Sequence, residues 1–224
     1  MQKPSGCRHM HGCCANDLRG QGDSDFPTDA YSNHDDLIAL LEELGGRDVT
    51  LLGLSAGVQV ALDVALVAPQ LVARLVLVSP SVAGYAPAEM PAFLAELTAS
   101  LRAGDFDQAN EVLLASSLMS VPPEHAARVR AMVEDNDRLW TIPYSLVEQP
   151  SQPALDRLGD IAAPTLVLVG GNDEEAIRAQ GVLLERRMVD ARQITVPAGG
   201  HLLNLTSPAA FQEAVTEFLG LPRN

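Results

Sequence analysis

The chain has 224 residues, of which 47% are hydrophobic and 4% aromatic, and its formal net charge at pH 7 is −14. This composition is typical of one globular α/β domain, and the acidic balance argues against nucleic-acid and anionic-membrane partners because no basic stripe can neutralise phosphates. No apolar run is long enough to cross a bilayer and the N-terminus lacks the apolar segment of a secretory signal, so we expect a cytoplasmic protein.

The first 16 residues contain all three cysteines, Cys7, Cys13 and Cys14, so no disulfide framework crosslinks the core. The run CRHMHGCC offers the thiolate and imidazole groups that zinc binds. Its spacings are tighter than those of zinc fingers, and nothing later in the chain completes a ligand set. We therefore expect residues 1–16 to be a disordered tail, with a metal site as the alternative, and we expect no metal or organic cofactor.

Helices and strands alternate along the chain that follows. Residues 16–33 are rich in Gly, Asp, Ser and Pro and predict a long loop. The acidic pair Asp35 and Asp36 then marks a helix start, and Gly45 and Gly46 mark its end. The apolar face of this helix is predicted to comprise Leu37, Leu40, Leu41 and Leu44.

The short, continuous apolar run at residues 49–54 predicts a parallel strand that is covered on both faces. Further strands are expected at residues 75–78, 165–169 and 193–196, and further helices at 56–67, 174–188 and 207–219. This alternation predicts an α/β fold, with a mostly parallel sheet and flanking helices.

Residues 82–160 interrupt the alternation with helix-like segments separated by Pro and Gly, and no strand is predicted there. A helical insertion between two sheet strands is a natural lid. Its large apolar side chains either line an acyl pocket or pack the lid helices together, and they include Met90, Phe93, Leu139, Trp140 and Tyr144.

The segment GLSAG at residues 53–57 lies between the first predicted strand and an apolar helix. A serine hydroxyl becomes a nucleophile only with a base nearby, and the oxyanion it creates needs hydrogen-bond donors. A sharp strand-to-helix turn exposes the Ser55 hydroxyl and directs the backbone amide of Ala56 at the developing charge. The flanking glycines are expected to let neighbouring backbone approach. The alternative is that Ser55 only caps the helix.

A serine nucleophile requires a histidine and an acid at the carboxyl ends of later strands. Asp173 and His201 both follow predicted strands, although each could also be an ordinary turn or loop residue. In the predicted mechanism His201 takes the Ser55 proton and later protonates the leaving group, while Asp173 orients the imidazole and stabilises its cation.

These motifs resemble those of α/β-hydrolase-fold proteins, in the lidded branch of esterases, lactonases and carbon-carbon bond hydrolases. The resemblance covers residues 17–219 and is carried by DLRGQGDSD, GLSAG, PTLVLVGGND and AGGHLLNLTSPAAFQEAVTEFL. It implies one domain over residues 1–224, with residues 82–160 as a lid inserted before the acid-bearing strand. It also implies a serine hydrolase that cleaves an ester, lactone or related carbonyl bond of a small, partly apolar substrate.

The front of the chain departs from this pattern, since relatives place three strands and a His-Gly loop before DLRG. Only four residues separate Gly12 from Asp17, so we interpret the HG at residues 11–12 as an accidental match and the fold as N-terminally truncated. Loss of a neighbouring strand predicts self-association through an exposed sheet edge. Loss of the second oxyanion donor leaves an alternative function, a catalytically weak or inactive binding or assembly module.

Overall fold

The computed structural model describes residues 12–222, in which four parallel strands form one sheet. Their spatial order is the same as their order in the chain: β1 (Val49–Leu54), β2 (Val72–Val78), β3 (Thr165–Gly170) and β4 (Ala191–Val196). The predicted α/β fold with a mostly parallel sheet is confirmed. Because the strands are parallel, their carboxyl ends lie at one edge of the sheet, where such folds gather functional loops.

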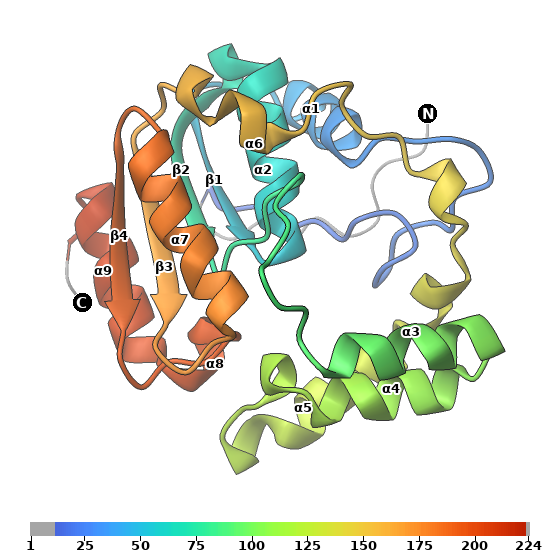
Figure 1. The fold of residues 1–224 in the computed structure, drawn as a ribbon. Coiled ribbons are helices and arrows are strands. Elements are labelled where there is room, and N and C mark those ends of the chain that lie inside the picture. The colour runs from blue at the N-terminus through green and yellow to red at the C-terminus, as the bar shows by residue number, and fades with distance from the viewer. Residues whose placement is uncertain (1–11, 223–224) are drawn as a thin grey trace.

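Helices cover the two faces of the sheet (Figure 1). The first face packs against α1 (Asn33–Glu43), α2 (Ala56–Val67), α6 (Ala154–Arg157) and α7 (Glu175–Arg187). The second face packs against α8 (Leu203–Thr206) and α9 (Pro208–Leu219). No helix within residues 12–222 combines the length and hydropathy needed to cross a membrane.

The alternation of side chains along β2 and β3 builds both layers of the core. Leu75 and Leu77 pack on the first face, whereas Val76 and Val78 pack on the second. All six residues of β3 are buried, as expected for a central strand covered on both sides. β2 and β4 begin earlier than predicted because backbone pairing extends them across Arg74 and Arg192.

β1 contradicts the prediction of a strand covered on both faces. Within the described residues its only strand neighbour is β2, and the exposed fraction of Leu52 is 51%. Thr50, on the same face, is also exposed. The helix α9 packs against β3 and β4, so its layer leaves this part of β1 open to solvent.

The helix α1 begins and ends near the predicted residues, but only two of the four residues predicted for its apolar face pack against the core. Ser32 caps the N-terminus by accepting a hydrogen bond from the Asp35 amide, and Asp35 and Asp36 occupy the first turn. Leu37 and Leu41 pack against the core. Leu44 lies beyond the last helical residue and is 42% exposed, because the chain turns away there.

Residues 93–134 form helices near the carboxyl edge of the sheet (Figure 1), whereas α6 and Leu158, which also belong to the predicted lid at residues 82–160, pack with the core of the first face. The helices of the lid are α3 (Phe93–Ala103), α4 (Phe106–Ala115) and α5 (Pro123–Glu134), with short 3-10 segments η2 (Ser117–Met119), η3 (Asp137–Thr141) and η4 (Tyr144–Leu146). The 3-10 segment η5 (Leu158–Asp160) follows α6 and packs with the core. A further 3-10 segment, η1 (Pro69–Leu71), precedes β2.

Residues 141–150 depart from the helix-like pattern expected across residues 82–160, since they contain η4 and an isolated parallel bridge between Tyr31 and Val147. The bridge forms because the Tyr31 amide donates to the Leu146 carbonyl and the Glu148 amide donates to the Tyr31 carbonyl. Backbone hydrogen bonds to a distant segment thus satisfy groups that a helix would have paired internally.

Candidate active site

Ser55 occupies a strained turn between β1 and α2. Its φ is 53° and its ψ is −114°, a backbone conformation that residues other than glycine rarely adopt. A Cβ atom on Gly53 would lie 2.4 Å from the Gly57 carbonyl oxygen, so this close approach requires glycine at position 53. The Ser55 amide donates to the Val78 carbonyl over 2.9 Å, which ties the turn to β2.

The Ser55 hydroxyl makes no hydrogen bond with any described residue and does not cap α2. The capping alternative is therefore wrong. Ala56 is exposed, and because it is the first residue of α2 its amide has no partner within the helix. An amide at the positive end of a helix is suited to binding a developing oxyanion.

Gly57 differs from its predicted role. A Cβ atom at this position would meet no atom within 4 Å, so the fold does not need glycine there for space. Of the two glycines in GLSAG, Gly53 alone permits the tight packing of β1 against the first turn of α2.

The loops that carry Asp173 and His201 are joined by backbone hydrogen bonds. The Gly171 amide donates to the Val196 carbonyl over 2.8 Å, and the Asn172 amide donates to the Gly199 carbonyl over 2.9 Å. A Cβ atom on Gly170 would lie 2.4 Å from the Gly199 oxygen, so only glycine allows the loops to approach this closely. The ends of β3 and β4 thereby hold two polar side chains together.

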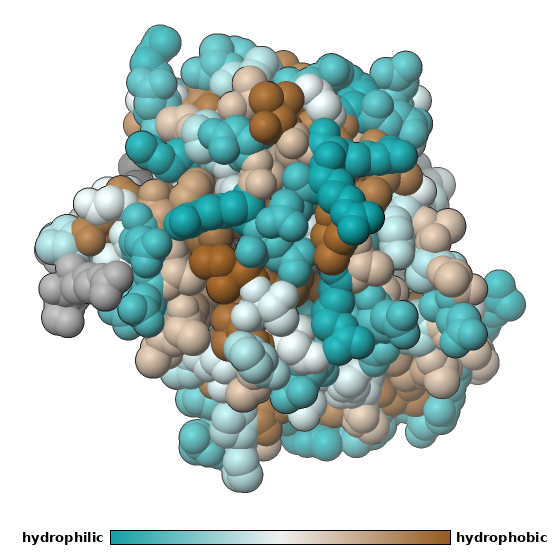
Figure 2. All heavy atoms as spheres, turned by 60° about the vertical axis from the view of Figure 1, so that its left-hand side comes forward, coloured by the Kyte–Doolittle hydropathy of each residue, from teal (hydrophilic) through white to brown (hydrophobic). Residues whose placement is uncertain are grey.

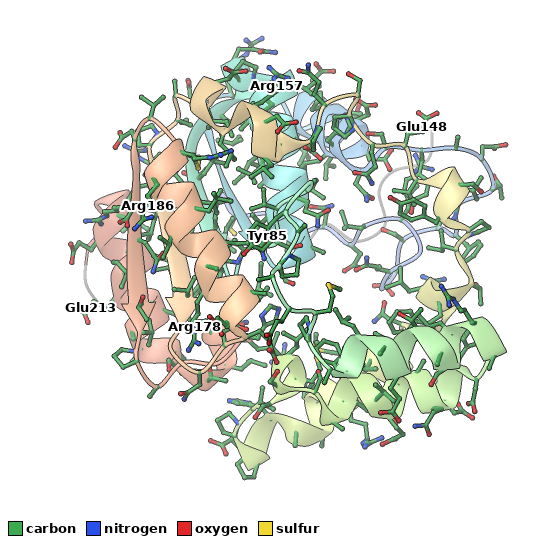
Figure 3. All side chains as sticks on the ribbon, in the orientation of Figure 1. Tyr85, Glu148, Arg157, Arg178, Arg186 and Glu213 are labelled. Atoms are coloured by element: carbon green, nitrogen blue, oxygen red, sulfur yellow. The ribbon has the colours of Figure 1, made fainter. Side chains whose placement is uncertain are left out.

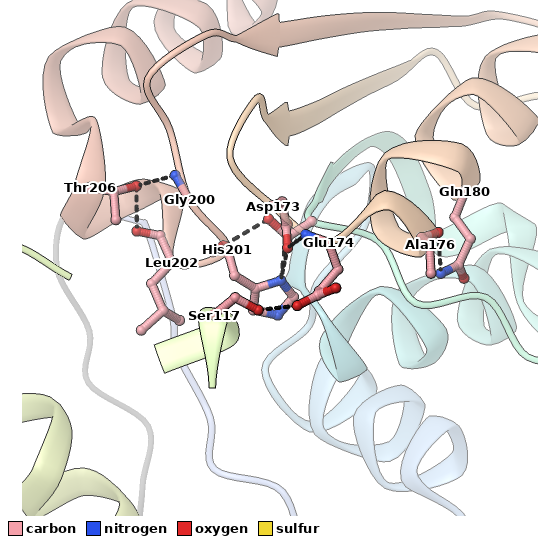
Figure 4. A network of polar contacts seen from close by, with 10 residues as sticks. Ser117, Asp173, Glu174, Ala176, Gln180, Gly200, His201, Leu202 and Thr206 are labelled. Atoms are coloured by element: carbon pink, nitrogen blue, oxygen red, sulfur yellow. Dashed lines mark hydrogen bonds and ion pairs between the residues drawn. The ribbon is translucent and has the colours of Figure 1, made fainter. Parts of the chain in front are cut away.

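Asp173 and His201 form a buried pair in these loops (Figure 4). His201 Nδ1 lies 3.0 Å from both Oδ1 and Oδ2 of Asp173, and the two residues are 2% and 5% exposed. A carboxylate only accepts hydrogen bonds, so Nδ1 carries the proton and Nε2 of a neutral ring is left to accept one.

Ser79 fixes the His201 backbone, a role that the sequence analysis missed. Its buried hydroxyl donates to the His201 carbonyl over 2.7 Å. Ser79 follows β2 directly and has a φ of 46°, so it shares with Ser55 a strained position after a strand. The signal available in the sequence was this position, since the other site candidates also follow strands. The Gly200 amide, which donates to Thr206 Oγ1 over 3.0 Å, secures the same loop.

The three predicted catalytic residues therefore lie at the same edge of the sheet. Asp173 and His201 are in contact. Ser55 directly follows β1, an outermost strand of the described sheet, and forms no hydrogen bond with His201. Asp173 also accepts a hydrogen bond from the Glu174 amide over 2.8 Å. This arrangement provides a hydroxyl, an oriented imidazole and a helix N-terminus, which is the chemical equipment for acyl transfer.

A cavity of about 350 Å³ lies between α2, the segment after β2, the lid and the start of α7. Gln59, one turn along α2 from Ser55, lines it together with Tyr85, which Figure 3 shows between α2 and α7. Met90 and Phe93 line it too, in agreement with one predicted role for the large lid side chains.

Two other lid residues are placed differently. The Trp140 ring packs with the lid core and its Nε1 donates to Asn110 Oδ1, while Tyr144 is 81% exposed. Leu139 is partly buried and does not line the cavity.

The predicted tail and its metal alternative fall mostly on residues 1–11, which lie outside the described residues. Within residues 12–222 no three histidine, cysteine or acidic side chains are placed to hold a metal ion. His11 of the HG pair also lies outside the described part, so the second oxyanion donor is assigned to no residue.

Residues 9–214 match the alpha/beta hydrolase family. The chain belongs to this family. The match covers most of the chain and agrees with the resemblance that the motifs suggested. The protein is thus a member of a hydrolase family, with a parallel sheet flanked by helices.

Two curated relatives show the range of hydrolases that this α/β hydrolase resembles. The mouse (Mus musculus) sn-1-specific diacylglycerol lipase ABHD11 is 31% identical over 214 residues, which are 91% of this chain and 70% of the lipase. The 2-hydroxy-6-oxononadienedioate/2-hydroxy-6-oxononatrienedioate hydrolase of Cupriavidus pinatubonensis is 30% identical over 91% of this chain and 74% of its own.

A solved structure agrees with the fold. The crystal structure of a hydrolase from Pseudomonas aeruginosa is similar with a TM-score of 0.68 and 29% identity, covering 91% of this chain and 78% of that one.

Proposed function

We propose that this α/β hydrolase is a serine hydrolase that cleaves an ester, lactone or related carbonyl bond of a small, partly apolar substrate. The observation that carries the proposal is the buried Asp173–His201 pair at the same sheet edge as the unbonded Ser55 hydroxyl. Membership of a hydrolase family and the similarity to a lipase support it.

In the proposed reaction Ser55 Oγ attacks the substrate carbonyl while His201 Nε2 accepts its proton. Asp173 keeps the other ring nitrogen protonated and stabilises the imidazolium. The Ala56 amide donates to the oxyanion, and His201 then protonates the leaving group. Water activated by the neutral imidazole releases the acyl group from Ser55.

A second function, a binding or assembly module with little catalysis, is favoured by two observations. Ser55 and His201 are not hydrogen-bonded to each other, and Ala56 supplies the one oxyanion amide assigned in residues 12–222. Loss of one oxyanion donor typically lowers turnover by about a hundredfold or more. Catalytic hydrogen bonds often tighten only in the substrate complex, however, so the proposal of catalysis is compatible with the unbonded hydroxyl.

Labelling with a fluorophosphonate probe distinguishes the two functions. We expect Ser55 to be labelled, Ser55→Ala to abolish labelling, and His201→Ala to slow it strongly because the hydroxyl loses its base. Ser55→Ala should also lower ester hydrolysis by about a thousandfold or more.

Ser207→Ala is the matched control, because this serine lies after the His201 loop and its side chain makes no capping hydrogen bond. Labelling and hydrolysis should be unchanged in this variant. Folded wild-type protein that resists the probe would overturn the catalytic proposal and favour the binding module.

A further inference from the structure

Glu174 is the one charged side chain among the described residues that line the cavity. Most of the other lining side chains are apolar, including Val82, Phe93, Leu94 and Leu118. A cavity of this kind favours hydrocarbon groups, and its few polar groups set which substrates are accepted. Ser55, Asp173 and His201 do not line the cavity, but Glu174 directly follows Asp173 in the chain, so its carboxylate is the charge that a ligand in the cavity would meet.

Two contacts hold Glu174 between the proposed catalytic loop and the lid. Its amide donates to Asp173 Oδ1 over 2.8 Å, and its carboxylate accepts a hydrogen bond from the Ser117 hydroxyl of η2 (Figure 4). Because the backbone and the side chain are both anchored, the negative charge is fixed at the cavity wall rather than free to turn into solvent.

The cationic groups nearby do not neutralise this charge within the cavity. His201 is buried and paired with Asp173. Arg178, in the first turn of α7, donates from Nη1 to the Gly171 carbonyl over 2.6 Å and does not line the cavity. The chain as a whole carries a formal charge of −14, which adds to the negative potential.

We propose that Glu174 determines substrate charge, so that the cavity accepts neutral and cationic groups and rejects carboxylate-bearing groups of the same size. Two like charges in a partly desolvated site repel far more strongly than they do in water. An ammonium or a hydrogen-bond donor is instead attracted to the carboxylate. As a statement about substrates this inference rests on the proposed hydrolase function, but the binding preference does not require catalysis.

Three ligands of matched shape test the preference directly: 4-phenyl-1-butanol, 4-phenylbutylamine and 4-phenylbutyrate. None contains an ester, so wild-type protein binds them without turnover, and their dissociation constants follow from ligand-observed NMR titration. We expect the carboxylate to bind at least about tenfold more weakly than the alcohol, and the amine to bind at least as tightly as the alcohol.

Glu174→Gln should bring the carboxylate to within about twofold of the alcohol. Glu175→Gln is the matched control, since it removes the same charge from an adjacent, exposed residue that does not line the cavity. Ser117→Ala keeps the charge but removes the hydroxyl that anchors it, so it should weaken the discrimination less than Glu174→Gln does. Glu174→Ala serves as a second charge deletion if the Gln variant fails to fold.

Three results would overturn the inference. Wild type could bind the alcohol and the carboxylate equally tightly, Glu174→Gln could leave the ratio of the two dissociation constants unchanged, or Glu175→Gln could change this ratio as much as Glu174→Gln does. Failure of all three ligands to bind would also overturn it, because the cavity would then not be a binding site. Failure of Ser55 to react with a fluorophosphonate would instead refute catalysis and leave these binding results standing.

Discussion

Backbone strain is concentrated beside the candidate site. Of the described residues other than glycine, Asp48, Ser55 and Ser79 have positive φ. Two of these three directly follow β1 and β2 at the edge of the sheet that also bears Asp173 and His201. Such conformations cost of order 1–3 kcal/mol each and persist only where surrounding contacts enforce them. The hydrogen bonds from the Ser55 and Ser79 amides to Val78 and Leu168 supply that enforcement.

Asp63 is a buried acid that the proposed reaction does not use. It is 5% exposed on α2, and its Oδ1 has no hydrogen-bond partner among the described residues. Burial raises the pKa of Asp63, and the nearby His34 partly offsets this by lowering it. The folded state therefore holds the proton more tightly than the unfolded state, and the stability from this group is lost as pH rises through the raised value.

We expect Asp63→Asn to stabilise the protein at pH 7 by about 1–2 kcal/mol, because the variant avoids burying an unpaired charge. The advantage should shrink toward pH of about 4, because the raised pKa lets folded wild-type Asp63 take up a proton more readily than the unfolded chain does. Urea unfolding at the two pH values measures the difference.

Asp190→Asn, at an exposed aspartate, is the control and should change stability little at either pH. A variant less stable than wild type at pH 7 would contradict the prediction and show that attraction to His34 outweighs the burial of the carboxylate.

At the scale of elements, the turn between β1 and α2 requires only one of its two glycines, Gly53 and Gly57. Gly53→Ala should destabilise the protein by at least about 2 kcal/mol, because the new Cβ would overlap the Gly57 carbonyl. Gly57→Ala should be neutral or stabilising by up to about 1 kcal/mol, since the space is open and alanine favours the helix. Thermal unfolding followed by circular dichroism compares the two variants. Equal destabilisation by both would show that the turn itself, rather than the contact at Gly53, requires glycine.

The lid is attached to the rest of the molecule through side chains of η3 and the residue before it. Arg138 donates to the carbonyls of Gly20, Gly22 and Ser24, and the Gly22 amide donates to Asn136 Oδ1. These bonds, together with the Ser117–Glu174 contact, hold the lid at two separate places, one on the long loop before α1 and one beside Asp173. Polar contacts thus position the outer part of the lid, whose own core is a small cluster formed by α3 and α4, whereas Val82 and Leu158 at its two ends pack into the main core.

At the scale of the whole molecule, the exposed side of β1 is the feature that departs most from a closed α/β fold. The face over α7, β4 and α9 carries mainly polar side chains, with hydrophobic ones in small groups (Figure 2). On β1, by contrast, an apolar side chain, Leu52, is half exposed on a strand that has one described neighbour. Unpaired strand edges with apolar side chains tend to pair with other chains. Self-association through this edge stays a prediction, opposed by the acidic net charge.

We expect the protein to form dimers or larger species as its concentration rises, and Leu52→Lys to shift it toward monomer. Val189→Lys is the matched control, because it makes the same change of charge at another exposed apolar residue, 70% exposed, outside any strand. Sedimentation velocity over a range of concentrations measures both. Wild-type protein that is monomeric throughout would contradict the prediction.

The sequence by itself determined the order of the main helices and strands and the positions of Ser55, Asp173 and His201 after strands. These features are local, since apolar periodicity, glycine and proline positions and the strand-to-helix junction depend on neighbouring residues. Tertiary structure alone decided that Ser79 anchors the His201 loop, that Glu174 faces the cavity, and that Leu52 is exposed. Each of these outcomes depends on which distant segment packs against the residue, and neither spacing nor hydropathy along the chain encodes that contact.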